Sequence, residues 1–388
     1  MAESKEKAKE KVNHFSKLAL ELFENIVKDV NPKDLLTIRA TSRECAAKVA
    51  KVYAKEHFTG LLLHLHDDRS VEKCLAICKH PLLGPAVRTF TISIDPCDRG
   101  NKWLDDRLCT VEHRHSTRGP TTADPEPYEE FITRLQQDAE WHVIIELFTN
   151  MADACQVSAL RIVGHERYQS TFAGGYHDFD LEGDPDWACA HAFAGIMYCL
   201  DRSNLHVDTL EIDKDARYAM PMCELWDYFD MFARVMSPVE SLSLVLWRRH
   251  GTLPADAEML NQLLAGLASS TTIRHLYIDC QSCENIDLAT VFPIEDSGFP
   301  NLESLHLQGN DQLMFDVPVL VDFVTSHQRT LQRLELHSLC VEPNGLEDDG
   351  WDLMEEGVAK NIRRLTGLED VTVDRDTEES WLDMMRQM

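Results

Sequence analysis

The chain has 388 residues, of which 44% are hydrophobic and 27% are charged, so it is long enough for more than one folded unit and has the composition of a globular protein. No stretch approaches the roughly 18 apolar residues that a membrane-spanning helix needs, which argues against a membrane partner. The net charge of −28 combines +3 over residues 1–60 with −31 over the remainder. Because an acidic surface repels phosphate backbones, this balance argues against nucleic acid as a partner.

Residues 1–13 form a charged N-terminal tail in which no apolar segment follows the lysines and glutamates. This pattern differs from a secretory signal, which needs an apolar core after its positive charges. The chain also holds 12 cysteines without regular pairing, a composition that suits reduced thiols. Together these features predict a cytoplasmic or nuclear location.

Residues 14–58 have the pattern of three short helices. The first carries one apolar stripe at four-residue spacing, formed by Leu18, Leu22, Ile26 and Val30. Asn31 and Pro32 supply the N-cap and the first position of a second helix, and Ser42 lies where the third begins. Three helices of this size make a marginal core on their own. We therefore expect the helices of this unit to pack against a partner.

The same segment resembles the F-box of the fungal type. That family commonly reads Leu-Pro-x-Glu-Leu-x-x-x-Ile, then Pro-x-Asp-Leu-Leu-x-Leu-Arg, then Ser-Arg. Residues 18–26, 32–39 and 42–43 match these three signatures in order. One departure is Ala19, which stands where the family usually has a proline that helps to form the docking loop.

This resemblance implies that the module binds the Skp-type adaptor of a cullin–RING ubiquitin ligase while the rest of the chain holds a protein substrate. Carried over position by position, the contacts with the adaptor fall on Leu18, Ala19, Leu20, Leu22, Ile26, Leu35 and Leu36. The alternative for Leu22, Ile26 and Leu35 is that they only hold the three helices together. The missing proline bears on affinity for the adaptor more than on the fold.

Downstream of the module, eight copies of the pattern apolar–x–x–apolar–x–apolar predict eight short strands. Their first residues are Val87, Val157, Val207, Val239, Ile273, Leu302, Leu331 and Leu368. The last two apolar residues of each copy are two apart, so they face one side of the strand while the residues that flank them face the other. Such a strand buries its apolar side only when it stacks with its neighbours.

Apolar residues at helical spacing separate these strands. The predicted helices cover residues 129–155, 187–201, 221–236, 256–269, 317–328 and 352–365. This alternation resembles the leucine-rich repeat in degenerate form. It implies an α/β fold in which the helical module precedes a curved solenoid of parallel strands with outer helices. The predicted solenoid spans residues 61–376, with insertions at 96–128 and 164–186, and a capping helix follows at 377–388.

Strand parity predicts which side chains line the solvent-facing side of the sheet and bind a protein substrate. The later strands gather an aromatic residue, three histidines and mixed charges there, which is typical of a recognition surface. An aromatic and cationic loop follows the fourth predicted strand. The predicted substrate-binding residues are Trp247, Arg248, His275, Tyr277, Asp279, His306, Gln308, Arg333, Glu335 and His337. The alternative is that these are ordinary polar strand faces exposed to water.

The sequence contains none of the signatures GxxxxGK, GxGxxG, GxSxG and HExxH. The pairs Cys280/Cys283 and His64/His66 lack the companions that a metal site needs. We therefore expect no cofactor, no metal and no catalytic residue, and we predict a non-enzymatic substrate receptor of an SCF-type ubiquitin ligase. Two alternatives stay open: a repeat scaffold that does not bind the ligase, and an enzyme with a site between the repeats and the insertions.

Overall fold

The computed structural model describes residues 17–65, 67–94, 133, 136–137, 139–163, 185–212, 229–245, 255–279, 298–309, 314–342, 358–375 and 377. Several sequence predictions lie outside these residues: the charged tail, the first insertion, most of the second, the loop with Trp247 and Arg248, and the capping helix beyond Thr377. Within the described residues the chain is an α/β protein with a nine-stranded parallel sheet and ten α-helices. The predicted α/β class is therefore confirmed.

The N-terminal module consists of three helices, α1 (Leu20–Val27), α2 (Pro32–Arg39) and α3 (Arg43–His57). The predicted caps are confirmed. The Asn31 side chain accepts a 2.9 Å hydrogen bond from the amide of Lys33, and Ser42 accepts one of 3.1 Å from the amide of Cys45. Each bond satisfies an amide that has no partner inside its own helix. Both helix starts are therefore determined by neighbouring residues.

The core of this module is in contact with the two ends of the predicted apolar stripe but not with its centre. It is formed by Phe23, Val27, Leu35, Val49 and Val52, with Leu18, Val30 and Ile38 packed against it. Leu22 and Ile26, at the centre of the stripe, are 56% and 52% exposed, so they do not hold the three helices together. Helix α1 carries two adjacent apolar stripes, Leu22/Ile26 and Phe23/Val27, and periodicity does not distinguish between them. Packing of α1 against α3 buries the second.

Nine parallel strands form the main sheet, and their spatial order follows their order along the chain. They are β1 (Gly60–His64), β2 (Thr89–Ser93), β3 (Ala159–Val163), β4 (Thr209–Ile212), β5 (Ser241–Val245), β6 (His275–Asp279), β7 (Ser304–Gln308), β9 (Arg333–His337) and β11 (Asp370–Val373). Eight of these confirm the strands that the repeated pattern predicts. The ninth, β1, starts the predicted solenoid and has the same spacing, with apolar residues at Phe58, Leu61 and Leu63, a copy not counted among the eight.

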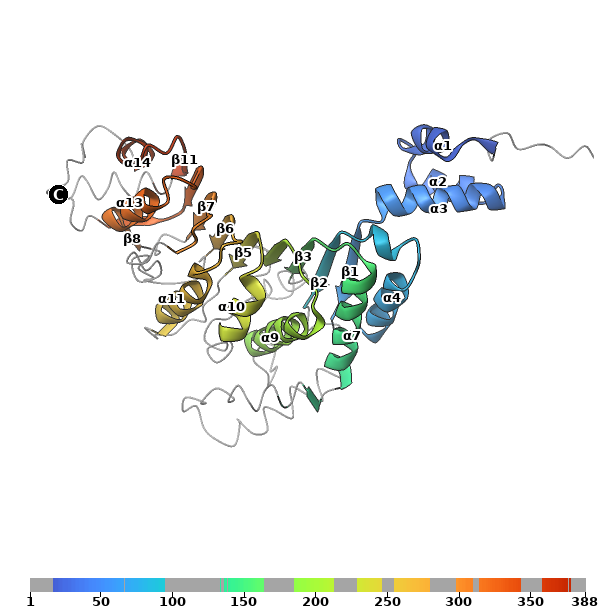
Figure 1. The fold of residues 1–388 in the computed structure, drawn as a ribbon, viewed down its shortest axis with the longest axis horizontal. Coiled ribbons are helices and arrows are strands. Elements are labelled where there is room, and N and C mark those ends of the chain that lie inside the picture. The colour runs from blue at the N-terminus through green and yellow to red at the C-terminus, as the bar shows by residue number, and fades with distance from the viewer. Residues whose placement is uncertain are drawn as a thin grey trace, which may run out of the picture.

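The helices follow the strands along the chain and lie on one side of the sheet. They are α4 (Asp68–Cys78), α7 (Ala139–Ala154), α9 (Pro185–Ser203), α10 (Phe229–Met236), α11 (Ala255–Ala268), α13 (Val317–Ser326) and α14 (Val358–Thr366), with a short 3-10 turn, η2 (Gly84–Ala86), before β2. A separate two-stranded sheet pairs β8 (Met314–Asp316) with β10 (Cys340–Glu342). Figure 1 shows the array as an arc with the strands along its inner side. In the described part of the chain, no helix is long and apolar enough to cross a membrane.

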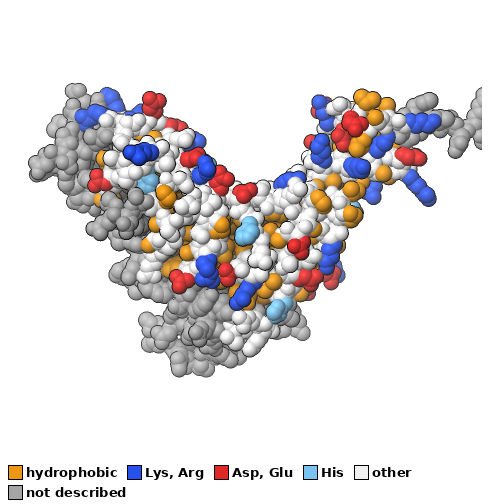
Figure 2. All heavy atoms as spheres, in the orientation of Figure 1, with side chains coloured by type: hydrophobic (Ala, Val, Ile, Leu, Met, Phe, Trp, Pro, Cys, Tyr) orange, Lys and Arg blue, Asp and Glu red, His pale blue; other side chains and the backbone are white. Residues whose placement is uncertain are grey.

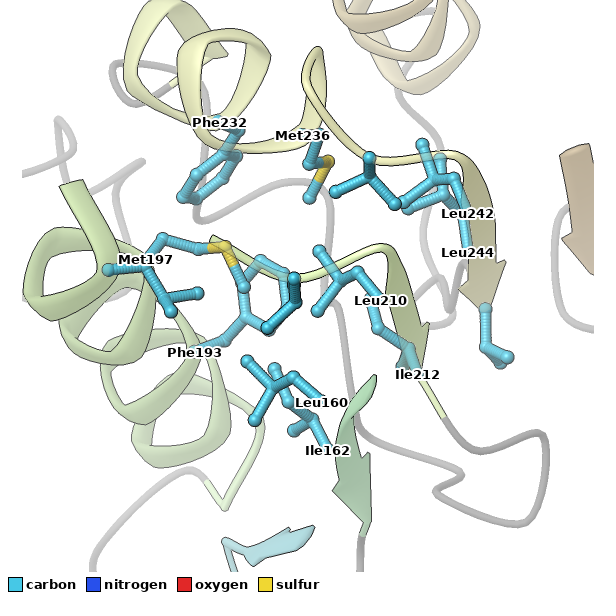
Figure 3. Packing of buried hydrophobic residues seen from close by; sticks show 14 of the residues in the cluster. Leu160, Ile162, Phe193, Met197, Leu210, Ile212, Phe232, Met236, Leu242 and Leu244 are labelled. Carbon is cyan, nitrogen blue, oxygen red and sulfur yellow. The ribbon is translucent and has the colours of Figure 1, made fainter. Parts of the chain in front are cut away.

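The apolar side of the sheet and the helices share one continuous core. Figure 3 shows its centre, where side chains of β3, β4 and β5 point toward Phe193 and Met197 of α9 and Phe232 and Met236 of α10. The rings of Phe193 and Phe232 meet edge to face at 5.3 Å. Burial of each large apolar side chain contributes about 1.5–3 kcal/mol. Because every strand contributes only two or three such residues, stability depends on stacking of consecutive repeats.

Consecutive strands are held in the same register by a repeated backbone contact at their starts. The amides of Arg274 and His275 both bond to the carbonyl of Glu240, and the amides of Glu303 and Ser304 bond to the carbonyl of Arg274. The same arrangement recurs from β1 to β9. Equivalent side chains of successive strands therefore form rows that cross the sheet.

Candidate binding surface

The candidate binding surface is the side of the sheet that faces away from the helices. The predicted parity is confirmed there: in β3, Leu160 and Ile162 are buried against the helices, and Arg161 between them is partly exposed. Figure 2 shows the molecule hollowed between its two ends, and in Figure 1 the strands run along this hollow. The surface is therefore concave, and each strand contributes one residue to each row that crosses it.

The last position of three strands departs from the prediction. Strand parity places Ser93, Val245 and Asp279 on the solvent-facing side, and all three are buried. Tyr277 lies two residues before Asp279 on the same side, with its hydroxyl 3.3 Å from Oδ2 of Asp279. Asp279, at 0% exposure, is thus not available to a substrate. It supports Tyr277 instead.

Four residues of β6, β7 and β9 form what we call the histidine cluster: Tyr277, His306, Glu335 and His337. Tyr277, His306 and Glu335 are register partners on the three strands, and His337 lies two residues after Glu335. The rings of Tyr277 and His306 are 4.5 Å apart, and those of His306 and His337 are stacked at 4.7 Å. Nδ1 of His306 donates a hydrogen bond to Oε2 of Glu335. Residues from three repeats therefore form one contact network.

Neighbouring side chains extend this network along the sheet. The Tyr277 hydroxyl donates to Oε1 of Gln308 at 2.9 Å. The guanidinium of Arg333 forms an ion pair with Oε1 of Glu335 and lies 3.7 Å from Oδ2 of Asp370. The carboxylate of Glu335 is thus shared between an imidazole and a guanidinium. Partial burial strengthens such shared charges relative to fully exposed pairs.

Asp374, just after β11, is a second carboxylate next to the histidine cluster. Its Oδ2 lies 3.9 Å from Nδ1 of His337 and accepts a hydrogen bond of 2.9 Å from the amide of Ser338. Burial raises the pKa of Asp374, but hydrogen bonds from Thr377 and Ser338 and the nearby His337 outweigh it and leave the pKa below its usual value. At His306, burial lowers the pKa below its usual value, although the bond to Glu335 acts in the opposite direction.

The structure thus brings together most of the predicted substrate-binding residues. Tyr277, Gln308, His306, Glu335, His337 and Arg333 are joined by the contacts above. His275 is the first residue of β6 and is not part of the cluster; it shares a 2.9 Å hydrogen bond with Ser304. Trp247 and Arg248 lie outside the described residues. Strand parity places Asp374 on this side of the sheet, but Asp374 was not among the predicted substrate-binding residues.

The helical module presents a second, apolar surface. Leu22 and Ile26 are one helical turn apart on α1 and are exposed, as is Ala19 just before the helix, whereas Leu18 and Leu20 are partly buried. Figure 2 shows apolar side chains among charged ones on this module, at the upper right. Leu35 corrects the prediction: it is fully buried in the core, so its side chain does not reach a partner. The side chain of Leu36 is outside the described residues.

Comparison with known proteins finds no family model that matches this chain and no curated protein that is significantly similar to it. Any function must therefore be argued from these two surfaces.

Proposed function

We propose that this protein is a non-enzymatic substrate receptor of an SCF-type cullin–RING ubiquitin ligase. The helical module binds a Skp-type adaptor, and the concave side of the sheet binds a protein substrate. Ubiquitin transfer then depends on holding the substrate near the ligase, which raises its effective concentration. No side chain of this chain takes part in the transfer chemistry.

The observation that carries the proposal is the exposed pair Leu22 and Ile26. Together with Ala19 they form an apolar strip on a helix whose own core is completed by other residues, Phe23 and Val27. An apolar strip that the module does not need for folding is suited to contact with a partner. The strip falls on positions where the F-box resemblance puts contacts with the adaptor.

The conformation of Ala19 supports the same function despite the absent proline. Its φ of −56° and ψ of 152° lie in the range that proline adopts. The loop before α1 therefore has a proline-like backbone without a proline. We expect Ala19→Pro to keep the fold and to bind the adaptor at least as tightly as the natural chain.

The experiment is co-expression of the full chain with a Skp-type adaptor, followed by co-purification. The test variant is the double substitution Leu22→Glu with Ile26→Lys, which preserves net charge and adds a favourable pair at i, i+4 on the helix. The matched control carries the same types of change at exposed apolar positions outside the module, Leu82→Glu with Val143→Lys. Loss of the adaptor from the test variant alone supports the proposal.

A folded natural chain that does not co-purify with the adaptor overturns it. The second candidate, a repeat scaffold that binds proteins outside ubiquitination, then becomes the better account. Ala19 in place of the usual proline is the observation that favours this candidate. In this second candidate, the concave surface is still the protein-binding site, and the exposed strip binds a partner other than the adaptor.

A further inference from the structure

We propose that His306, Glu335 and His337 bind a divalent transition-metal ion, for which zinc is the best suited. One ligand atom from each residue lies within 4.8 Å of the other two. Imidazole nitrogens and carboxylate oxygens are common zinc ligands, and three protein ligands leave a fourth coordination position open. The site is on the concave surface, and its existence does not depend on binding of the adaptor.

The two strands hold the three ligands in place. His306 on β7 pairs in register with Glu335 on β9, and His337 follows two residues later on the same side of β9. Ligand atoms about 2.0–2.1 Å from a tetrahedral zinc ion are roughly 3.4 Å from each other. The hydrogen-bonded backbone holds the Cα positions, and the stacked imidazoles must rotate so that the lone pairs of their nitrogens converge on one ion.

The imidazole of His306 provides a second observation. Its Nε2 is buried and has no hydrogen-bond partner among the described residues. Buried polar atoms without a partner are uncommon and frequently indicate a water or an ion. Nδ1 of the other histidine, His337, lies 3.9 Å from the carboxylate of Asp374, which is beyond hydrogen-bond distance but places a carboxylate beside it, as is usual for metal-binding histidines.

The guanidinium of Arg333 competes with the metal ion for the carboxylate of Glu335. It pairs with Glu335, and a cation at this position reduces the affinity of the carboxylate for a metal. Asp370 offers Arg333 an alternative carboxylate at 3.7 Å, so Arg333 retains a partner when Glu335 turns to the metal. We therefore expect Arg333→Gln to bind zinc more tightly than the natural chain.

The test measures zinc binding by the full chain after treatment with a chelator, using calorimetry with zinc chloride and the visible absorption of cobalt. The natural chain is compared with His306→Asn combined with His337→Asn. The matched control is His275→Asn, because His275 is on the same side of the sheet but outside the cluster. We expect the double variant to lose one bound equivalent, His275→Asn to keep it, and Glu335→Gln to bind at least roughly tenfold more weakly.

Circular dichroism first checks that each variant is folded. Should the double variant fail to fold, modification of histidines in the natural chain replaces it, with mass spectrometry of the products. Zinc is expected to protect His306 and His337 from the reagent and to leave His275 reactive. The proposal is overturned when the folded double variant binds as much zinc as the natural chain, or when zinc protects neither residue.

Discussion

The imidazole rings of His306 and His337 are stacked, 4.7 Å apart and 7° from parallel, although they belong to different strands, β7 and β9. The residues are not at the same register level, because Gln308 rather than His306 is the partner of His337. The stack therefore runs diagonally across two repeats. It joins the carboxylates of Glu335 and Asp374 into one region of the concave surface, which is the region that we assign to metal.

The two apolar stripes of α1 differ in their contribution to stability. We expect Phe23→Ala to destabilise the helical module by about 3–5 kcal/mol, because a fully buried aromatic ring is removed. The double variant Leu22→Glu with Ile26→Lys is expected to change the free energy of unfolding of the module by less than about 1 kcal/mol, because both side chains are exposed. Hydrogen exchange over residues 17–57 measures both effects. Equal loss of protection in the two variants would contradict the burial described for α1.

Gly195 sets how closely α7 and α9 approach each other. A Cβ at this position would overlap the indole ring of Trp141, which is itself buried. We expect Gly195→Ala to cost about 1–3 kcal/mol through overpacking and to lower the thermal midpoint. The matched control is Gly60→Ala, since a Cβ there meets no atom within 4 Å. The expectation fails if both variants melt at the temperature of the natural chain.

The Tyr277 hydroxyl connects the cluster to the buried carboxylate of Asp279. We expect Tyr277→Phe to lower the free energy of unfolding by about 0.5–1.5 kcal/mol, because the single hydroxyl proton that is shared between Gln308 and Asp279 is lost. Chemical denaturation measures the change, with His275→Ala as a control at an exposed position of the same strand. An unchanged midpoint for Tyr277→Phe would mean that the hydroxyl contributes no net stability.

Three cysteines are expected to differ in reactivity. Burial raises the pKa of the Cys74 thiol to about 11 and raises that of Cys199 further still. The hydrogen bond from Cys78, in contrast, lowers the pKa of Cys155. Because the thiolate is the reactive form, iodoacetamide should modify Cys155 first, and its rate should rise at a lower pH than that of Cys74.

Peptide mass spectrometry after timed alkylation distinguishes these thiols, and unfolding in urea is expected to make their rates similar. Modification of Cys74 or Cys199 before Cys155 in the folded protein would be inconsistent with the described burial.

Features that depend on residues close together in the chain could be predicted from the amino-acid sequence. The spacing of apolar residues located eight of the nine strands and the side that each one buries, because alternation along a strand is a local property. Asn31 and Ser42 marked two helix starts for the same reason. Tertiary packing determines which stripe of α1 is buried, because Leu22/Ile26 and Phe23/Val27 are both apolar and contact with α3 buries the second. Tertiary packing also places the hydroxyl of Tyr277 next to Asp279 and brings His306 into contact with Glu335 and His337. These contacts depend on the register between strands, which backbone hydrogen bonds between repeats establish and no local pattern records.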